Sequence, residues 1–203
     1  MVGGPGSGAG TTPQQADRPG RILTVCTGNI CRSPLLERVL QRELDRAWGP
    51  GSYEVASAGT HGLEGLPMDE RAAAVLGTLG GQHEGFLARR LRPAFVADAD
   101  LVLTATLDQR SRVVRASPAA IRYAFTFREL AALAKDLTDQ ELPGRLPPAE
   151  RLRAVTVLLM QRRGQVKVAD PDIIDPYRRE DEVYAQMERE IRAALPGVLR
   201  VLT

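Results

Sequence analysis

The chain has 203 residues, of which 43% are hydrophobic and 26% are charged, and its formal net charge is +2. This composition is typical of a soluble globular domain with a sizeable core, and it excludes a chain that is disordered throughout. Nucleic-acid binding is not indicated, because the sequence has no run of Lys and Arg with interleaved aromatic residues.

The cellular setting and the domain limits follow from simple patterns. Two cysteines cannot form a disulfide framework, no run of about 18 apolar residues predicts a membrane span, and residues 1–20 lack the apolar core of a signal peptide. We therefore expect a soluble protein of the reducing cytoplasm. Residues 1–20 are rich in Gly, Pro, Ser, Thr and Gln, so they predict a disordered tail before a single domain over 21–203.

The predicted elements alternate between strands and helices. The first strand, residues 22–25, is short, apolar and rich in β-branched residues, as in a buried parallel strand. A helix is expected from Ser33-Pro34 onward, because Ser is a good N-cap and Pro is favoured at the first helical position. Further strands are expected at 53–57, 101–103 and 121–125, and further helices at 69–79, 107–116, 127–136, 150–162 and 179–202. This order predicts a doubly wound, four-stranded parallel sheet flanked by helices.

Both cysteines lie in the stretch VCTGNICRSP, between the first predicted strand and the first predicted helix. Open α/β sheets bind ligands at this place, against a helix N-terminus. A loop of this length can turn its amides inward to bind a tetrahedral dianion. Gly28 allows a close backbone approach and Asn29 tolerates left-handed geometry. The expected phosphate-binding residues are Thr27, Gly28, Asn29, Ile30, Cys31 and Arg32.

The side chains of the same stretch predict a nucleophile. Arg32 offers a bidentate fork to two phosphoryl oxygens. A helix N-terminus and a guanidinium both stabilise a thiolate, and Ser33 could donate its hydroxyl to it. Cys26, at the base of the loop, would then attack phosphorus and form a phosphocysteine. A metal half-site is the alternative, but His61 and His83 are the sole histidines, so no metal or other cofactor is expected.

Several motifs resemble those of the low-molecular-weight protein tyrosine phosphatases. The loop VCTGNICRSP resembles the family's signature loop, and similar segments follow along the chain. These are Ser57-Ala58-Gly59-Thr60, Ala88-Arg89-Arg90-Leu91, Ala99-Asp100-Leu101-Val102-Leu103 and Asp175-Pro176-Tyr177. The resemblance covers residues 21–202 and is weakest in 138–168, which we interpret as an insertion.

The resemblance implies further roles. Asp175 corresponds to the family's general acid, which protonates the leaving group and then serves as base, and Tyr177 would line the pocket. Asp170 precedes a proline in the same way and is the alternative acid. In the family a second cysteine can form a reversible disulfide with the nucleophile, so Cys31 is either a redox guard or a small wall residue.

One residue of the loop helps to distinguish between the possible substrate classes. Related protein-arginine phosphatases carry Thr where this chain has Ile30, whose apolar side chain suits an aryl ring. Thiol-relay arsenate reductases need further cysteines, which do not occur after Cys31. We expect a phosphotyrosine protein as substrate, by family analogy a bacterial tyrosine kinase or a component of an exopolysaccharide system. The alternatives are phosphoarginine hydrolysis, arsenate reduction, and a phosphate-binding module without turnover.

Overall fold

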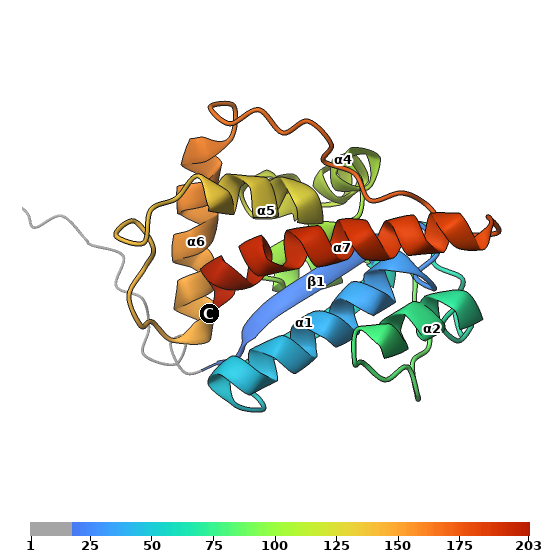
Figure 1. Cartoon of the computed structure of the whole chain (residues 1–203). Coiled ribbons are helices and arrows are strands. Elements are labelled where there is room, and N and C mark those ends of the chain that lie inside the picture. Colours follow the sequence, from blue (N-terminus) through green and yellow to red (C-terminus); the bar gives the residue numbers. More distant parts are fainter. Residues whose placement is uncertain (1–17) are drawn as a thin grey trace, which may run out of the picture.

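The computed structural model describes residues 18–203, and it contains a four-stranded sheet covered by helices (Figure 1). The strands are β1 (Gly20–Cys26), β2 (Tyr53–Gly59), β3 (Leu101–Thr104) and β4 (Ala124–Thr126). Their order is β2-β1-β3-β4, and every neighbouring pair is parallel. The predicted α/β fold class is confirmed. Parallel strands all end at one edge of the sheet, so the loops that follow them lie together there.

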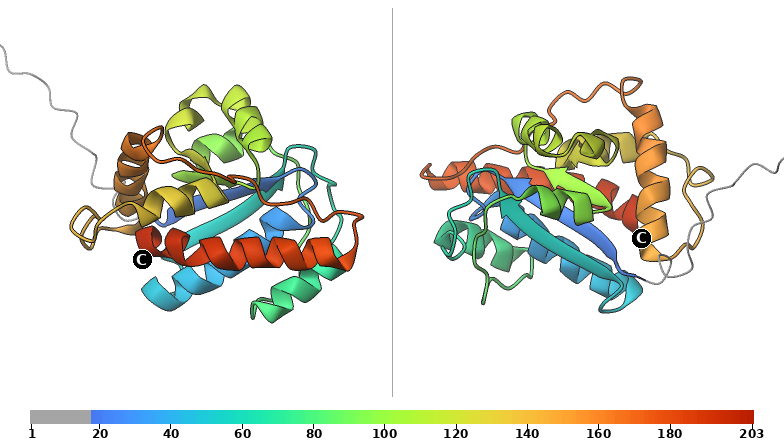
Figure 2. Two further views of the ribbon diagram at one scale, coloured as in Figure 1. Left: turned by 45° about the horizontal axis from the view of Figure 1, so that its top comes forward. Right: turned by 180° about the vertical axis from the view of Figure 1, so that it is seen from behind.

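The helices form a layer on each face of the sheet. They are α1 (Arg32–Trp48), α2 (Glu70–Thr78), α3 (Pro93–Asp98), α4 (Leu107–Ala116), α5 (Phe127–Lys135), α6 (Pro148–Arg162) and α7 (Asp181–Leu202). In Figure 1 the helices α1 and α7 lie in front of β1, and the rear view in Figure 2 shows shorter green helices on the opposite face.

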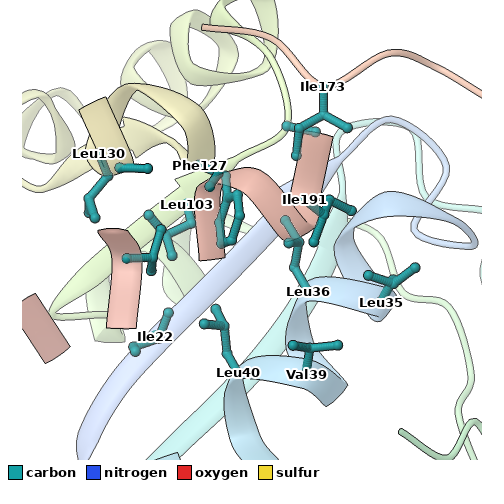
Figure 3. Packing of buried hydrophobic residues seen from close by; sticks show 14 of the residues in the cluster. Ile22, Leu35, Leu36, Val39, Leu40, Leu103, Phe127, Leu130, Ile173 and Ile191 are labelled. Carbon is teal, nitrogen blue, oxygen red and sulfur yellow. The ribbon is translucent and has the colours of Figure 1, made fainter. Parts of the chain in front are cut away.

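The core divides into two clusters because successive side chains of a strand point to opposite faces. Ile22 belongs to the larger cluster, on the side of α1 and α7, whereas Leu23 belongs to the smaller one. In the third strand, Leu103 and Val102 divide in the same way. Figure 3 shows Ile22 and Leu103 on the larger side, facing the side chains of α1, α5 and α7. Both faces of β1 are therefore buried, which explains its continuous apolar sequence.

Two local expectations were wrong in detail. The strand expected at 121–125 is a 3₁₀ helix, Pro118–Arg122, followed by the short strand β4. Proline favours the first turn of a helix, and Ile121 is 47% exposed, so the apolar residue that suggested a strand does not enter the core. Helix α3 was not expected, because six residues are too few to show a helical period.

Strand β1 begins one residue before the predicted domain start. Residues 1–17 of the expected tail lie outside the described residues, but Gly20 already belongs to β1. Arg18 forms a bidentate pair with Asp100, at 2.6 and 2.7 Å, which ties this segment to the start of β3. Among the residues that the structure describes, no helix is long and apolar enough to cross a membrane.

The segment 138–168 contributes a helix to the core. Helix α6 covers the N-terminal end of β1, where a Cβ on Gly20 would lie 3.0 Å from Leu152. The side chains of Leu152, Val155 and Leu159 are fully buried. This segment therefore packs at the end of β1 that lies opposite the loop containing the two cysteines (Figure 1).

Candidate active site

The loop between β1 and α1 is held by a neighbouring segment whose amides bind the carbonyl groups of the loop. The carbonyl oxygens of Cys26, Thr27, Gly28 and Ile30 accept hydrogen bonds from the amides of Thr60, His61, Leu63 and Asp69, at 2.9–3.0 Å. Within the described residues, the amides of Gly28, Ile30, Cys31 and Arg32 donate to no acceptor. A loop with four carbonyls engaged by the neighbouring segment can present its free amides to the inside, as in an anion-binding nest.

Asn29 adopts the left-handed conformation that the loop needs. Its φ is 58°, and its fully buried side chain forms three hydrogen bonds. Its Nδ2 donates to Ser33 Oγ at 2.9 Å and to Ser57 Oγ at 2.8 Å, and its Oδ1 accepts from the amide of Arg89 at 2.8 Å. Short polar side chains tolerate this conformation when such local contacts stabilise it. Asn29 is therefore the buried support of the loop rather than part of the pocket wall.

Ser33 does not cap the helix, contrary to expectation. Helix α1 begins one residue earlier, at Arg32, and no side chain caps it. The Ser33 hydroxyl instead lies 3.0 Å from Cys26 Sγ, and the amide of Asn29 approaches the same sulfur at 3.3 Å. Because the side-chain cap is missing, the first amides of α1 stay free at the loop. The sulfur has two polar contacts of the kind that stabilise a thiolate.

Arg32 is a buried cation whose guanidinium is incompletely bonded. Its side chain is 4% exposed, and its Nη2 lies 2.8 Å from Asp175 Oδ2. Its Nη1 donates to the carbonyl of Ile173 at 3.3 Å, whereas its Nε is buried and has no partner among the described residues. A buried unpaired donor costs free energy unless a ligand satisfies it. The site is therefore complete only with a bound acceptor such as an oxyanion.

A cavity of about 250 Å³ unites most of the predicted site residues. It is lined by Cys26, Thr27, Gly28, Ile30, Cys31, Arg32, His61, Leu63, Asp175 and Tyr177. Besides the loop and Arg32, the wall thus combines the apolar and aromatic side chains of Leu63 and Tyr177 with the polar ones of His61 and Asp175. Two predicted residues, Asn29 and Ser33, lie below the cavity instead of lining it.

The acidic residue of the cavity is Asp175. The segment that carries it is anchored by Ile173, which is 1% exposed, packs beside Ile191 of α7 (Figure 3) and donates its amide to Ala105 at 2.8 Å. Asp170 does not line the cavity, and its side chain is 78% exposed. Asp172 is exposed and accepts a hydrogen bond from the amide of Leu107, the first residue of α4.

Cys31 forms part of the cavity wall. It is 4% exposed, and both cysteines are free thiols. Burial is the main cause that raises the pKa of the Cys31 thiol far above its ordinary value, with the nearby Asp69 carboxylate adding to the effect. Cys31 is therefore a neutral thiol at physiological pH.

Sequence reasoning did not identify the residues that hold Asn29 in place. Ser57 and Arg89 lie in the two quoted segments that follow the signature loop, but no spacing links them to Asn29. His61 is exposed and also lines the cavity. Among the residues the structure covers, no group of three or more His, Cys, Asp or Glu is placed to hold a metal ion.

The fold and the loop define an α/β protein with an anion-binding nest after its first strand. The sequence profile described as "Low molecular weight phosphotyrosine protein phosphatase" matches residues 21–142. The chain belongs to this family. The segment after residue 142, which includes Asp175, lies outside the profile match.

Individual relatives agree with this assignment. The low molecular weight protein-tyrosine-phosphatase Etp of Escherichia coli is 41% identical over 97 residues, which are 48% of this chain and 62% of Etp. A low molecular weight protein-tyrosine-phosphatase of Streptomyces coelicolor is 31% identical over 180 residues, 88% of this chain and 91% of that protein. The solved YwlE arginine phosphatase of Geobacillus stearothermophilus is 26% identical, with a TM-score of 0.62 over 89% of this chain and 90% of that one.

Proposed function

We propose that this protein hydrolyses phosphotyrosine through a phosphocysteine intermediate. The observation that supports this most strongly is the placement of Cys26 Sγ, the free amides of the loop and the incompletely bonded Arg32 guanidinium around one cavity. A phosphoryl group bound there would accept the unpaired donors and present its phosphorus to the sulfur. This combines a nucleophile with an anion-stabilising site.

The first chemical step transfers the phosphoryl group to the enzyme. Cys26 Sγ attacks phosphorus, the bond between phosphorus and the tyrosine oxygen breaks, and Asp175 gives a proton to the departing oxygen. Arg32 and the loop amides bind the three non-bridging oxygens, on which charge develops. The Asp175 carboxyl is close enough for this role, because it already contacts Arg32 in the cavity.

The second step releases phosphate. Asp175, now ionised, takes a proton from water as the water oxygen attacks phosphorus, and the sulfur leaves as a thiolate. Ser33 Oγ, 3.0 Å from the sulfur, stabilises that thiolate and makes it a better leaving group. The step regenerates the free enzyme and consumes one water molecule, without a metal or organic cofactor.

The aryl ring is proposed to lie between Ile30 and Tyr177. Both line the cavity, together with Leu63. The relatives Etp and the Streptomyces coelicolor protein are named tyrosine phosphatases, whereas one structural relative is named an arginine phosphatase. Ile30 favours the tyrosine ester, because an isoleucine side chain offers no hydrogen bond to a guanidinium group.

Phosphate release from matched phosphotyrosine and phosphoarginine peptides tests the proposal. We expect the wild type to prefer phosphotyrosine and Ile30→Thr to shift the ratio of kcat/KM toward phosphoarginine. A wild type that prefers phosphoarginine, or consumes thiol only with arsenate, would overturn the substrate assignment. A wild type that binds inorganic phosphate but hydrolyses neither peptide would favour a binding module.

The physiological partner is proposed to be a tyrosine-phosphorylated protein, and the cytoplasm is its proposed setting, because a reducing compartment keeps the nucleophile reduced. A bacterial tyrosine kinase or a component of an exopolysaccharide system is the substrate that we infer by analogy with the family. Cys31 is proposed as a redox guard that forms a disulfide with Cys26 under oxidation, since both are free thiols of one loop.

A further inference from the structure

The edge of the cavity contains a turn with an unusual residue. The amide of Arg179 donates to the carbonyl of Pro176 at 2.9 Å, which closes a four-residue turn. Tyr177, the second residue of this turn, lines the cavity. Arg178, the third, has a φ of 59°. Turns that need a positive φ at the third position favour Gly or Asn, which adopt it with little strain.

Arg178 differs from the other non-glycine residue of this kind. Asn29 and Arg178 are the two non-glycine residues with positive φ between residues 18 and 203, and each is next in sequence to a residue that lines the cavity. Three buried hydrogen bonds stabilise the conformation of Asn29. Arg178 is exposed, and its side chain forms no hydrogen bond or salt bridge within that range. The local structure does not require arginine at this position. The distinctive property of Arg178 is therefore the positive charge of its guanidinium.

The guanidinium of Arg178 lies beside the ring of Tyr177, a residue of the cavity wall, and it has no carboxylate partner among the described residues. Its Cζ lies 5.1 Å from the centroid of the Tyr177 ring, a cation–π distance. Arg71, another exposed arginine that contacts this loop, is paired with Asp181 at 3.0 Å. A ring of the cavity wall thus contacts a cation that has no carboxylate partner between residues 18 and 203.

We propose that Arg178 selects phosphotyrosine sites that have an aspartate or glutamate next to the phosphotyrosine. The inference rests on the proposed function. With the substrate ring against Tyr177, the adjoining peptide leaves the cavity past this turn. One extended residue advances about 3.3–3.6 Å, so a carboxylate one or two positions from the phosphotyrosine can reach the guanidinium. A planar guanidinium pairs with a carboxylate through two hydrogen bonds, which favours acidic over neutral or basic neighbours.

The test compares two peptides that differ only in the residues flanking the phosphotyrosine, glutamate in one and glutamine in the other. The readout is the ratio of their kcat/KM values in the wild type and in Arg178→Ala, Arg178→Lys and Arg178→Glu. Exposed ion pairs are weak, so we expect the wild type to favour the acidic peptide about two- to fivefold. The ratio should approach one in Arg178→Ala, remain partly in Arg178→Lys, and reverse in Arg178→Glu.

Two controls separate this inference from folding and from the proposed function. Arg115→Ala removes an exposed arginine of α4 that forms no salt bridge with another described residue, and it should keep the wild-type ratio. Phenyl phosphate, which has no flanking residue, reports on the proposed chemistry alone. If the wild type hydrolyses phenyl phosphate but Arg178→Ala keeps the wild-type peptide ratio, the selection by Arg178 is wrong while the phosphatase proposal stands. If the wild type hydrolyses neither phenyl phosphate nor the peptides, the proposed function fails and this inference fails with it.

Discussion

The two ends of β1 are buried by opposite means. At its carboxyl end the interior contains polar residues, among them Asn29, Arg32 and Ser33, all of them buried. At its amino end the interior is mainly apolar, with Leu152 of α6 against the strand, and the buried carboxylate of Asp100 is paired with Arg18. Burying polar groups is costly unless every group is bonded, whereas burying apolar groups is favourable. The molecule therefore leaves donors unpaired at the loop, where a ligand can complete the hydrogen bonds, whereas the buried carboxylate at the opposite end of β1 is paired within the protein.

Among substitutions at the two ends of β1, we expect the largest effect from replacing the nucleophile at the carboxyl end. Cys26→Ser removes the sulfur and leaves a similar volume at the base of the loop. We expect hydrolysis of aryl phosphates to fall roughly 10⁴-fold or more, because loss of a nucleophile abolishes the covalent route. Thermal unfolding should stay close to the wild type. Residual activity within tenfold of the wild type would show that another group attacks phosphorus.

The next effect separates the two candidate acids. Asp175→Ala should lower kcat by about 10²–10⁴-fold for phenyl phosphate, whose leaving group needs a proton. It should lower kcat much less for an ester of an acidic phenol, which leaves unaided. Asp170→Ala is the matched control, because that side chain is exposed and does not line the cavity. A larger loss in the Asp170 variant would reverse the assignment of the general acid.

A substitution at the amino end of β1 should lower the free energy of unfolding and leave the catalytic rate unchanged. Leu152→Ala removes a fully buried side chain of α6, and we expect it to lower the free energy of unfolding by about 2–5 kcal/mol. Urea unfolding measures this change. The kcat of the folded fraction should remain near the wild-type value, because α6 lies at the opposite end of β1. A matching loss of kcat would show that the two ends are coupled.

The parts of the site that the sequence predicted are those in which neighbours along the chain carry the chemistry. Cys26, Gly28 and Arg32 lie within one turn-forming loop, so their spacing alone indicates an anion site. Asp175 is far along the chain and was found through a family resemblance, not through any spacing.

The remaining features depend on contacts between distant segments. Asn29 meets Ser57 and Arg89 only after three segments assemble, and no period or composition links them. Ser33 was expected to cap α1, since the sequence shows a capping residue but not the nearby sulfur that the hydroxyl contacts instead. The fourth strand was misplaced because Ile121 looks like a core residue in sequence and is exposed in the fold.

The smallest expected effect is on the pH dependence of the free energy of unfolding, through the carboxyl group of Glu37 buried beneath the loop. Ser57 Oγ donates to a carboxylate oxygen of Glu37, on α1, and links that carboxyl to Asn29. Burial raises the pKa of Glu37, and the hydrogen bond from Ser57 opposes that rise. The folded state therefore holds the Glu37 proton more tightly than the unfolded chain does. The contribution of Glu37 to the free energy of unfolding is fully present at pH values below the pKa of Glu37 in the unfolded chain. It is lost as the pH rises through the higher pKa that Glu37 has in the folded protein.

Glu37→Gln tests the direction of this pH dependence, because glutamine can still accept a hydrogen bond from Ser57 but does not titrate. We expect the free energy of unfolding of the wild type, relative to that of the variant, to decrease as the pH rises from about 4 through the raised pKa, and then to level off. Urea unfolding of both proteins across this pH range measures the difference, and groups common to both cancel. A difference that grows with pH would mean that the Ser57 hydrogen bond outweighs burial. In that case the polar end of β1 would favour the carboxylate, and the contrast between the two ends would be smaller than the structure implies.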